Sequence, residues 1–170
     1  MVEIIRKAVV DTGPLFDVLT LNFVRRHGRQ EVLGRTTMSP DPGVQDGYVR
    51  LFDSIRTILT TSHVVGELQG LESSRLRLRG PHLEDFWVAS ADFLTTRNFD
   101  ERLIPLLHMY SQARLREVLS AAGPSDTGLI DLALQEGCPL LTNDERTLAR
   151  RAWQLGVDCQ LVRWLVGPPT

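Results

Sequence analysis

The chain has 170 residues, of which 42% are hydrophobic and 24% are charged, with 19 Lys and Arg against 21 Asp and Glu. This size predicts one domain over residues 1–170 that folds without a disulfide or a structural metal. A net charge of -2 excludes a strongly basic nucleic-acid-binding protein, and no apolar run approaches the roughly 18 residues of a membrane span. Asp11 breaks the first apolar stretch too early for a signal peptide, so we expect a cytoplasmic protein. Cys138 and Cys159 lack the spacing of a zinc or redox pair and are expected to be buried free thiols.

The first predicted elements are a strand, a tight turn and a helix. Residues 4–10 have the β-branched, apolar character of a buried strand, which ends at Asp11-Thr12-Gly13-Pro14. Apolar residues then recur at helical spacing until Gly28. Residues 29–47 lose this periodicity and contain two prolines and several glycines, which predicts a long loop that is disordered or makes a functional contact. Deleting the centre of such a loop should leave the melting temperature nearly unchanged. Further helices are predicted over 48–58, from about 62 onward, and over 83–94.

The second half of the chain alternates strands and helices more regularly. A strand is predicted over 103–107 and a helix over 113–122, followed by a break at Gly123-Pro124-Ser125. Residues 126–136 form a helix closed by Gly137, 140–142 a short strand, 144–155 a helix closed by Gly156, and 159–162 the last strand. This alternation predicts an α/β domain with three layers, in which helices flank a mostly parallel central sheet.

Four acidic residues fall where such a fold places its ligands, beyond the carboxyl ends of the strands. Asp11 ends the first strand, Glu67 lies in the first turns of a helix, Asp126 opens another helix, and Asp144 closely follows the strand at 140–142. Each of them alone is more typical of a helix cap. Four carboxylates at one edge repel one another unless a cation neutralises them, and Mg²⁺ or Mn²⁺ prefers oxygen ligands. The histidines show no ligand spacing; they are His27, His63, His82 and His108.

Four motifs carry a resemblance to a known family. They are Val9-Val10-Asp11-Thr12-Gly13-Pro14-Leu15, Ser62-His63-Val64-Val65-Gly66-Glu67-Leu68, Ser125-Asp126-Thr127-Gly128-Leu129-Ile130-Asp131-Leu132-Ala133, and Leu140-Leu141-Thr142-Asn143-Asp144. Their order and approximate spacing resemble those of the PIN-domain family of metal-dependent nucleases, over nearly the whole chain. The resemblance implies a PIN-like fold in which Asp11, Glu67, Asp126 and Asp144 hold one or two Mg²⁺ or Mn²⁺ ions. Thr12 is expected to support the first acid, and Thr142 and Asn143 are expected to support the fourth motif. The departures are the segment 29–47, the extra acid Asp131 and a chain longer than the small toxin members.

The activity that the resemblance implies is hydrolysis of RNA, single-stranded or structured, to leave a 5′-phosphate and a 3′-hydroxyl. Metal ions can activate the attacking water and neutralise charge on the phosphoryl oxygens. We expect Asp11, Asp126 and Asp144 to hold the principal ion, and Glu67 to complete a second position or to orient the water. Two groups of arginines could form a basic rim for RNA, although surface arginines are commonly just solvated. These groups are Arg75, Arg77 and Arg79, and Arg146, Arg150 and Arg151.

The residues of the turn after the first predicted strand exclude two other folds. A haloacid-dehalogenase-type phosphatase would need an acid where Gly13 stands, and a P-loop or dinucleotide fold would need a glycine-rich turn. The open hypotheses are a toxin ribonuclease with a small antitoxin protein as partner, an RNA-processing nuclease, and an inactive PIN-like binding module. A homodimer is a further hypothesis, and no membrane partner is expected. Asp131 should point about 140° away from Asp126 around their helix, toward solvent or a partner, and Asp131→Asn should be nearly silent in cleavage.

Overall fold

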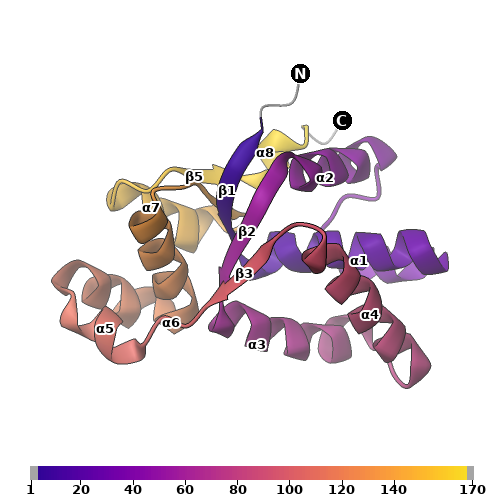
Figure 1. Ribbon diagram of the computed structural model, residues 1–170, viewed down its shortest axis with the longest axis horizontal. Helices are drawn as coiled ribbons and strands as arrows, with labels where there is room; N and C mark the ends of the chain where they lie inside the picture. Colours follow the sequence, from indigo (N-terminus) through magenta and orange to yellow (C-terminus); the bar gives the residue numbers. More distant parts are fainter. Residues whose placement is uncertain (1–3, 168–170) are drawn as a thin grey trace.

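A computed structural model describes residues 4–167 of the chain. Its centre is a five-stranded sheet in the order β3-β2-β1-β4-β5, and every pair of neighbouring strands is parallel. The strands are β1 (Ile5–Val10), β2 (Ile55–Thr61), β3 (Phe99–Arg102), β4 (Leu140–Thr142) and β5 (Cys159–Leu161). Helices flank this sheet on both sides (Figure 1), so the predicted three-layer α/β fold is confirmed.

Eight α-helices are described within residues 4–167. They are α1 (Thr12–His27), α2 (Pro42–Ser54), α3 (Ser62–Leu71), α4 (Pro81–Thr95), α5 (Leu106–Ser111), α6 (Ala113–Glu136), α7 (Arg150–Gln154) and α8 (Val162–Leu165). Three other helical segments accompany them within residues 4–167: the 3₁₀-helix η1 (Gln30–Arg35) and the π-helical segments η2 (Glu72–Leu76) and η3 (Glu145–Ala149). In Figure 1, α1, α3 and α4 lie to the right of the strands, and α5, α6 and α7 lie to the left. Among the helices of residues 4–167, none is long and apolar enough to cross a membrane.

The sequence pattern explains the first unit of the fold. The second half of β1, from Ala8 to Val10, is fully buried, and Asp11 caps the helix that follows by accepting a hydrogen bond from the backbone N–H of Thr12. Helix α1 buries most of its residues from Thr12 to Val24. It ends at Gly28, whose φ of 71° lies in the left-handed region that glycine adopts without a side-chain clash.

The prediction of one long loop over 29–47 was wrong, although residues 36–41 within it have neither helix nor strand. The segment forms η1 and the first turn and a half of α2, and it packs Val32, Leu33, Met38 and Val44 into the hydrophobic core. Asp41 caps α2 by accepting a hydrogen bond from the N–H of Gly43 at 2.7 Å. Pro42 and Gly43, two of the residues that indicated a loop, therefore belong to a helix start. Deleting the centre of the segment would remove core residues. We therefore expect such a deletion to lower the melting temperature, contrary to the prediction from the sequence.

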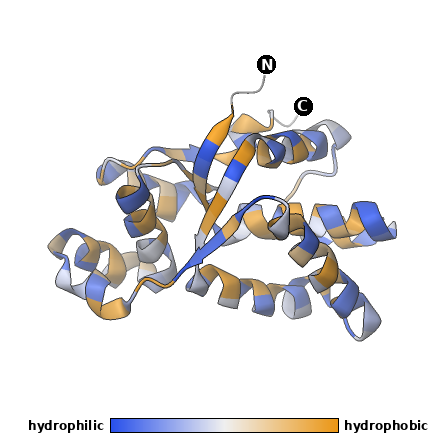
Figure 2. Cartoon of the chain, in the orientation of Figure 1, coloured by the Kyte–Doolittle hydropathy of each residue, from blue (hydrophilic) through white to orange (hydrophobic). Residues whose placement is uncertain are grey.

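Two further boundaries differ from the prediction. The predicted helix over 48–58 ends at Ser54, and β2 begins at Ile55. The buried residues Ile58 and Leu59 of β2 continue the helical spacing of the apolar residues in α2. The sequence pattern therefore predicted a helix where the strand lies. The predicted strand over 103–107 is displaced to Phe99–Arg102. After Phe99 this edge strand consists of charged residues and is mostly hydrophilic in Figure 2, as edge strands commonly are. Leu103 and Leu107, which suggested the strand, are exposed.

The C-terminal half follows the prediction closely. Gly123, with φ 85° and ψ 178°, breaks α6 into two helical segments at the predicted position, and Gly137 closes the second segment. Strands β4 and β5 form as expected. The predicted helix over 144–155 consists of η3 followed by α7.

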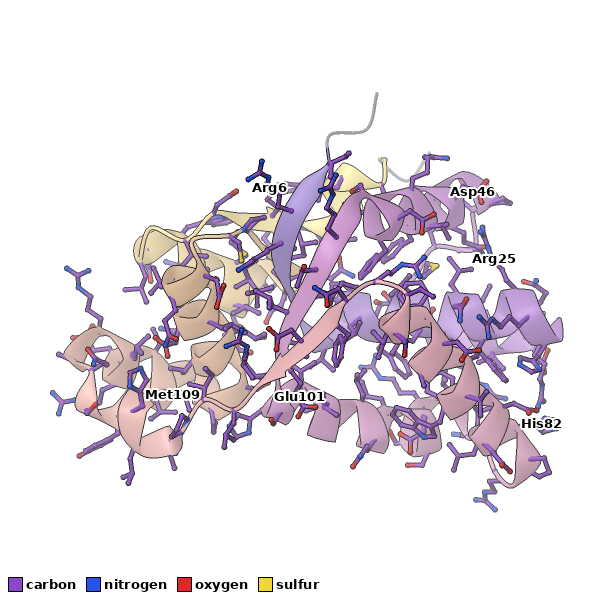
Figure 3. The ribbon with its side chains drawn as sticks, viewed as in Figure 1. Arg6, Arg25, Asp46, His82, Glu101 and Met109 are labelled. Carbon is purple, nitrogen blue, oxygen red and sulfur yellow. The ribbon has the colours of Figure 1, made fainter. Side chains whose placement is uncertain are left out.

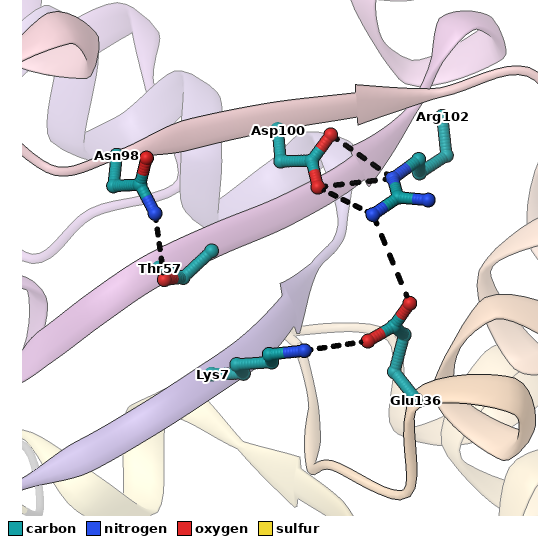
Figure 4. Close-up of polar contacts among 6 residues, drawn as sticks. All are labelled: Lys7, Thr57, Asn98, Asp100, Arg102 and Glu136. Atoms are coloured by element: carbon teal, nitrogen blue, oxygen red, sulfur yellow. Dashed lines mark hydrogen bonds and ion pairs between the residues drawn. The ribbon is translucent and has the colours of Figure 1, made fainter.

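A surface network joins the end of α6 to the strands (Figure 4). Lys7 Nζ donates to Glu136 Oε2 at 2.8 Å, and Arg102 Nη2 lies 2.7 Å from Asp100 Oδ2 and 3.9 Å from Glu136 Oε1. The cations of these ion pairs are exposed to solvent, so each pair contributes little to the free energy of unfolding. They join Glu136, at the end of α6, to Lys7 of β1 and Arg102 of β3.

Candidate functional site

The fold brings the four predicted acids toward one edge of the sheet. Asp11 follows β1 directly, Asp144 lies two residues after β4, and Glu67 lies on α3, the helix that follows β2. Asp126 lies in the first turn after the break at Gly123. Because β1, β2 and β4 are parallel neighbours, their carboxyl ends share one edge of the sheet.

One buried hydroxyl positions two of these acids. Thr142, which is completely buried, donates from Oγ1 to Asp11 Oδ2 at 2.6 Å and accepts from the backbone N–H of Asp144 at 2.9 Å. The other oxygen of Asp11 accepts from the N–H of Thr12 at 2.6 Å. Thr142 thus links the end of β1 to the loop after β4 and sets the orientation of the Asp11 carboxylate.

A second hydroxyl joins α1 to α3. Thr12 donates from Oγ1 to Glu67 Oε2 at 2.5 Å. The side chain of Thr12 therefore holds Glu67, while its backbone N–H supports Asp11. The predicted support of the first acid thus comes from the backbone of Thr12, and the contact with Glu67 was not foreseen.

The acids act on one another electrostatically. Burial, together with the negative charges of Asp11, Asp144 and Glu67, raises the pKa of Asp126 to about 7, against the opposing effect of the Arg151 cation. Burial also raises the pKa of Asp11 to about 6, against the hydrogen bonds from Thr142 and Thr12. Ionising all four carboxylates together is therefore costly in the folded chain.

The donor set suits a hard divalent cation, although the acids do not converge as they stand. Among residues 4–167, no three Asp, Glu, His or Cys side chains are arranged so that they could hold an ion. Several carboxylate oxygens are instead engaged by Thr12, Thr142 and the N–H of Thr147, which donates to Asp144 Oδ1 at 2.9 Å. The residues fit Mg²⁺ or Mn²⁺ in chemistry, since they are oxygen donors whose repulsion a cation would relieve. Binding would require side-chain rotation, in which the exposed carboxylates of Glu67 and Asp144 exchange their hydrogen bonds to Thr12 and to the N–H of Thr147 for contacts with the ion.

Asn143 supports the site from a distance, through residues that the sequence did not reveal. Its Nδ2 donates to the hydroxyl of Tyr48 at 2.9 Å, and that hydroxyl donates to Asp17 Oδ2 at 3.4 Å. Asp17 is 1% exposed and also accepts from the hydroxyl of Thr37 at 2.7 Å. This network ties the loop before Asp144 to α1 and α2. The only available signal was an acid within an apolar helical run, Phe16-Asp17-Val18.

The two arginine groups occupy different positions. Arg151 is half-buried and close enough to Asp126 to lower its pKa, whereas Arg146 and Arg150 are exposed on η3 and α7. The group of Arg75, Arg77 and Arg79 is exposed beyond the end of α3.

Asp131 is buried, which corrects its expected exposure. It is 6% exposed and lies under α5, where its Oδ2 is 3.1 Å from His108 Nε2 and accepts from Gln135 Nε2 at 2.7 Å. The helical count missed α5, which covers this face of α6. Of the two free cysteines, Cys159 is buried as expected and Cys138 is only half-buried.

Comparison of the chain with models of known protein families gave no match, and comparison with curated proteins gave none either. A functional assignment therefore depends on the residues and contacts described above.

Proposed function

We propose that the chain is a divalent-metal-dependent ribonuclease that hydrolyses RNA at Asp11, Glu67, Asp126 and Asp144. The observation that carries this proposal is the gathering of four mutually repelling carboxylates at the carboxyl edge of a parallel sheet. Burial and the charges of Asp11, Asp144 and Glu67 together raise the pKa of Asp126 to about 7, so the ionised cluster is unfavourable without a cation. A purely structural cluster gains nothing from such repulsion, whereas a site for Mg²⁺ or Mn²⁺ requires it. The resemblance of the four motifs to PIN nucleases supports RNA as the substrate.

Each acid has a distinct part in this proposal. Asp11, Asp126 and Asp144 would hold the principal ion, and Glu67 would complete a second position or orient the attacking water. A bound ion supplies a water that is nucleophilic near neutral pH and compensates charge on the phosphoryl oxygens. Thr142 keeps the Asp11 carboxylate turned toward the edge, and Thr12 restrains Glu67. No side chain needs to form a covalent intermediate with the RNA.

Two biological roles are compatible with a ribonuclease of this kind. A toxin role in the cytoplasm would involve a small antitoxin protein and a homodimer, and an RNA-processing role would need neither. A second candidate function is an inactive PIN-like binding module. The specific observation in its favour is that the acids are engaged by hydrogen bonds and do not converge among the described residues.

The test is cleavage of a pool of RNAs with and without metal. Chelation with EDTA should abolish cleavage, added Mg²⁺ or Mn²⁺ should restore it, and the products should carry 5′-phosphates. Asp126→Asn should reduce cleavage by orders of magnitude, because it keeps the side-chain shape but removes the charge that holds the cation. The matched control is Asp158→Asn, an exposed acid just before β5, at the opposite edge of the sheet. Undiminished cleavage in excess EDTA would refute the proposal, and no cleavage under any metal would favour the binding module.

A further inference from the structure

Four exposed arginines gather where α3 ends and α4 has not yet begun. Arg75 lies in η2, Arg77 and Arg79 follow it, and Arg35 comes from the end of η1. We call these four residues the arginine surface. In the described part of the chain, no ion pair joins any of them to an acid. Two of these charges act on acids without forming an ion pair. Arg75 opposes the burial that raises the pKa of Asp17, and Arg35 adds to the hydrogen bonds that lower the pKa of Glu31.

The backbone holds these arginines in place. Leu76 and Leu78 alternate with the arginines and are buried, at 0% and 5% exposure, so the chain is anchored on both sides of Arg77. Arg77 itself has φ 55° and ψ 34°, a left-handed conformation that a residue with a side chain adopts only at a cost. Arg35 Nη1 donates to the carbonyl of Leu76 at 2.5 Å, which fixes η1 against this segment.

Two adjacent hollows lie between these side chains. The first, of about 460 Å³, is lined by Arg35, Ser74, Arg75 and Arg77. The second, of about 180 Å³, shares Arg35 and Arg77 with the first and adds Arg79 and His82, with Arg29 and Glu31 at its wall. Glu31 is the one acid that lines either hollow, and Arg29 Nε donates to it at 2.9 Å. Both hollows therefore present guanidinium donors, the groups that bind phosphate in a bidentate manner.

The arginine surface is connected to the four acids by one continuous stretch of helix. Glu67 and Arg75 are eight residues apart along α3 and η2, which spans about 12 Å at the helical rise of 1.5 Å per residue. A nucleic-acid strand in a duplex advances about 3.4 Å per phosphate, so this span covers roughly three to four nucleotides. Figure 3 shows His82, which lines the second hollow, at the outer end of the molecule beside α4.

We propose that the arginine surface binds backbone phosphates of the RNA strand several nucleotides away from the bond that is cut. Two hollows that share a wall suit two neighbouring phosphates. The substrate is then an RNA that reaches from the acids to the arginine surface, and a dinucleotide is too short to use both. This inference rests on the proposed function, because the strand is placed relative to the cleavage site.

The test compares two triple variants with the same change in net charge. The first, Arg75→Gln with Arg77→Gln and Arg79→Gln, removes three cations from the arginine surface. The control, Arg6→Gln with Arg50→Gln and Arg56→Gln, removes three exposed cations near the amino ends of β1 and β2, where Figure 3 labels Arg6. Binding of a labelled single-stranded RNA is measured by fluorescence anisotropy in EDTA at several salt concentrations. Cleavage of a long RNA and of a dinucleotide is measured separately with Mn²⁺.

We expect the first variant to weaken binding of the long RNA at least tenfold and to reduce the slope of log affinity against log salt by about 2, at about 0.7 per lost phosphate contact. For cleavage of the long RNA, KM should rise with little change in kcat, and dinucleotide cleavage should be unaffected. Equal affinity and equal salt slope in the two variants would overturn the inference. Arginine-dependent binding without any metal-dependent cleavage would leave the phosphate-binding surface standing while the ribonuclease proposal fails. Metal-dependent cleavage combined with RNA binding that does not depend on these arginines would support the ribonuclease proposal and overturn the phosphate-binding surface.

Discussion

Replacing Asp126 by Asn should stabilise the metal-free protein at alkaline pH. Asp126 has an ordinary pKa of 3.8 and a folded-state pKa of about 7, so the folded chain holds the proton more tightly than the unfolded chain does. Stability is therefore lost as pH rises from about 4 to 7, and the full penalty is present above pH 7. Three units correspond to about 4 kcal/mol, but Asp126 is only half-buried, and solvent screening reduces the expected effect to about 1–2 kcal/mol. For a chain of this size that gain raises the melting temperature by about 3–6 °C.

The assay is thermal unfolding of both proteins in EDTA at about pH 5 and pH 8. The gain of Asp126→Asn over the wild type should be several-fold larger at the higher pH, and added Mn²⁺ should cancel it by stabilising the wild type alone. Asp158→Asn serves as the control and should show no such pH dependence. A variant that is less stable than the wild type at pH 8 in EDTA would refute the claim that burial and the neighbouring acids make the ionised form of Asp126 unfavourable in the folded chain.

Three further substitutions test other parts of the account. Thr142→Val removes the hydroxyl that hydrogen-bonds Asp11 and the N–H of Asp144, so it should lower the unfolding free energy by about 1–2 kcal/mol and the cleavage rate at least tenfold. The control Thr60→Val removes the buried hydrogen bond to the Val10 carbonyl and should lower stability by a similar amount without lowering the cleavage rate. Leu33→Ala should lower the unfolding free energy by about 2–5 kcal/mol, as measured by urea denaturation, and a loss below about 0.5 kcal/mol would mean that this segment is not packed. Asp131→Asn should change cleavage by less than about threefold, since the charge of Asp131 is not among those that act most strongly on the acids at the edge; loss of activity comparable to Asp126→Asn would mean that the two roles are exchanged.

The fold class could be predicted because its signals are local. The strand that ends at Asp11, the break at Gly123 and the cap at Gly137 each depend on a few neighbouring residues, and each lies where the pattern indicated. Periodicity failed where two elements adjoin without a turn. Because α2 passes into β2 between Ser54 and Ile55, no glycine or proline marks the change.

The candidate acids could be located, but their partners could not. The position of an acid after a strand is visible in the sequence, whereas the contact between Thr12 and Glu67 joins residues 55 positions apart. The contact between Thr142 and Asp11 spans 131 positions. The burial of Asp131 depends on α5, which covers it from another part of the chain. Such long-range contacts follow from packing of the whole domain and have no local signature.

The central claim is that the acids at the edge of the sheet form a site for a divalent cation, and titration calorimetry with Mn²⁺ tests it most directly. The wild type should bind one or two ions with saturation, Asp126→Asn should lose the principal binding event, and Asp158→Asn should bind as the wild type does. A wild type that takes up no Mn²⁺ and no Mg²⁺, or an Asp126→Asn variant that binds as tightly as the wild type, would contradict the claim.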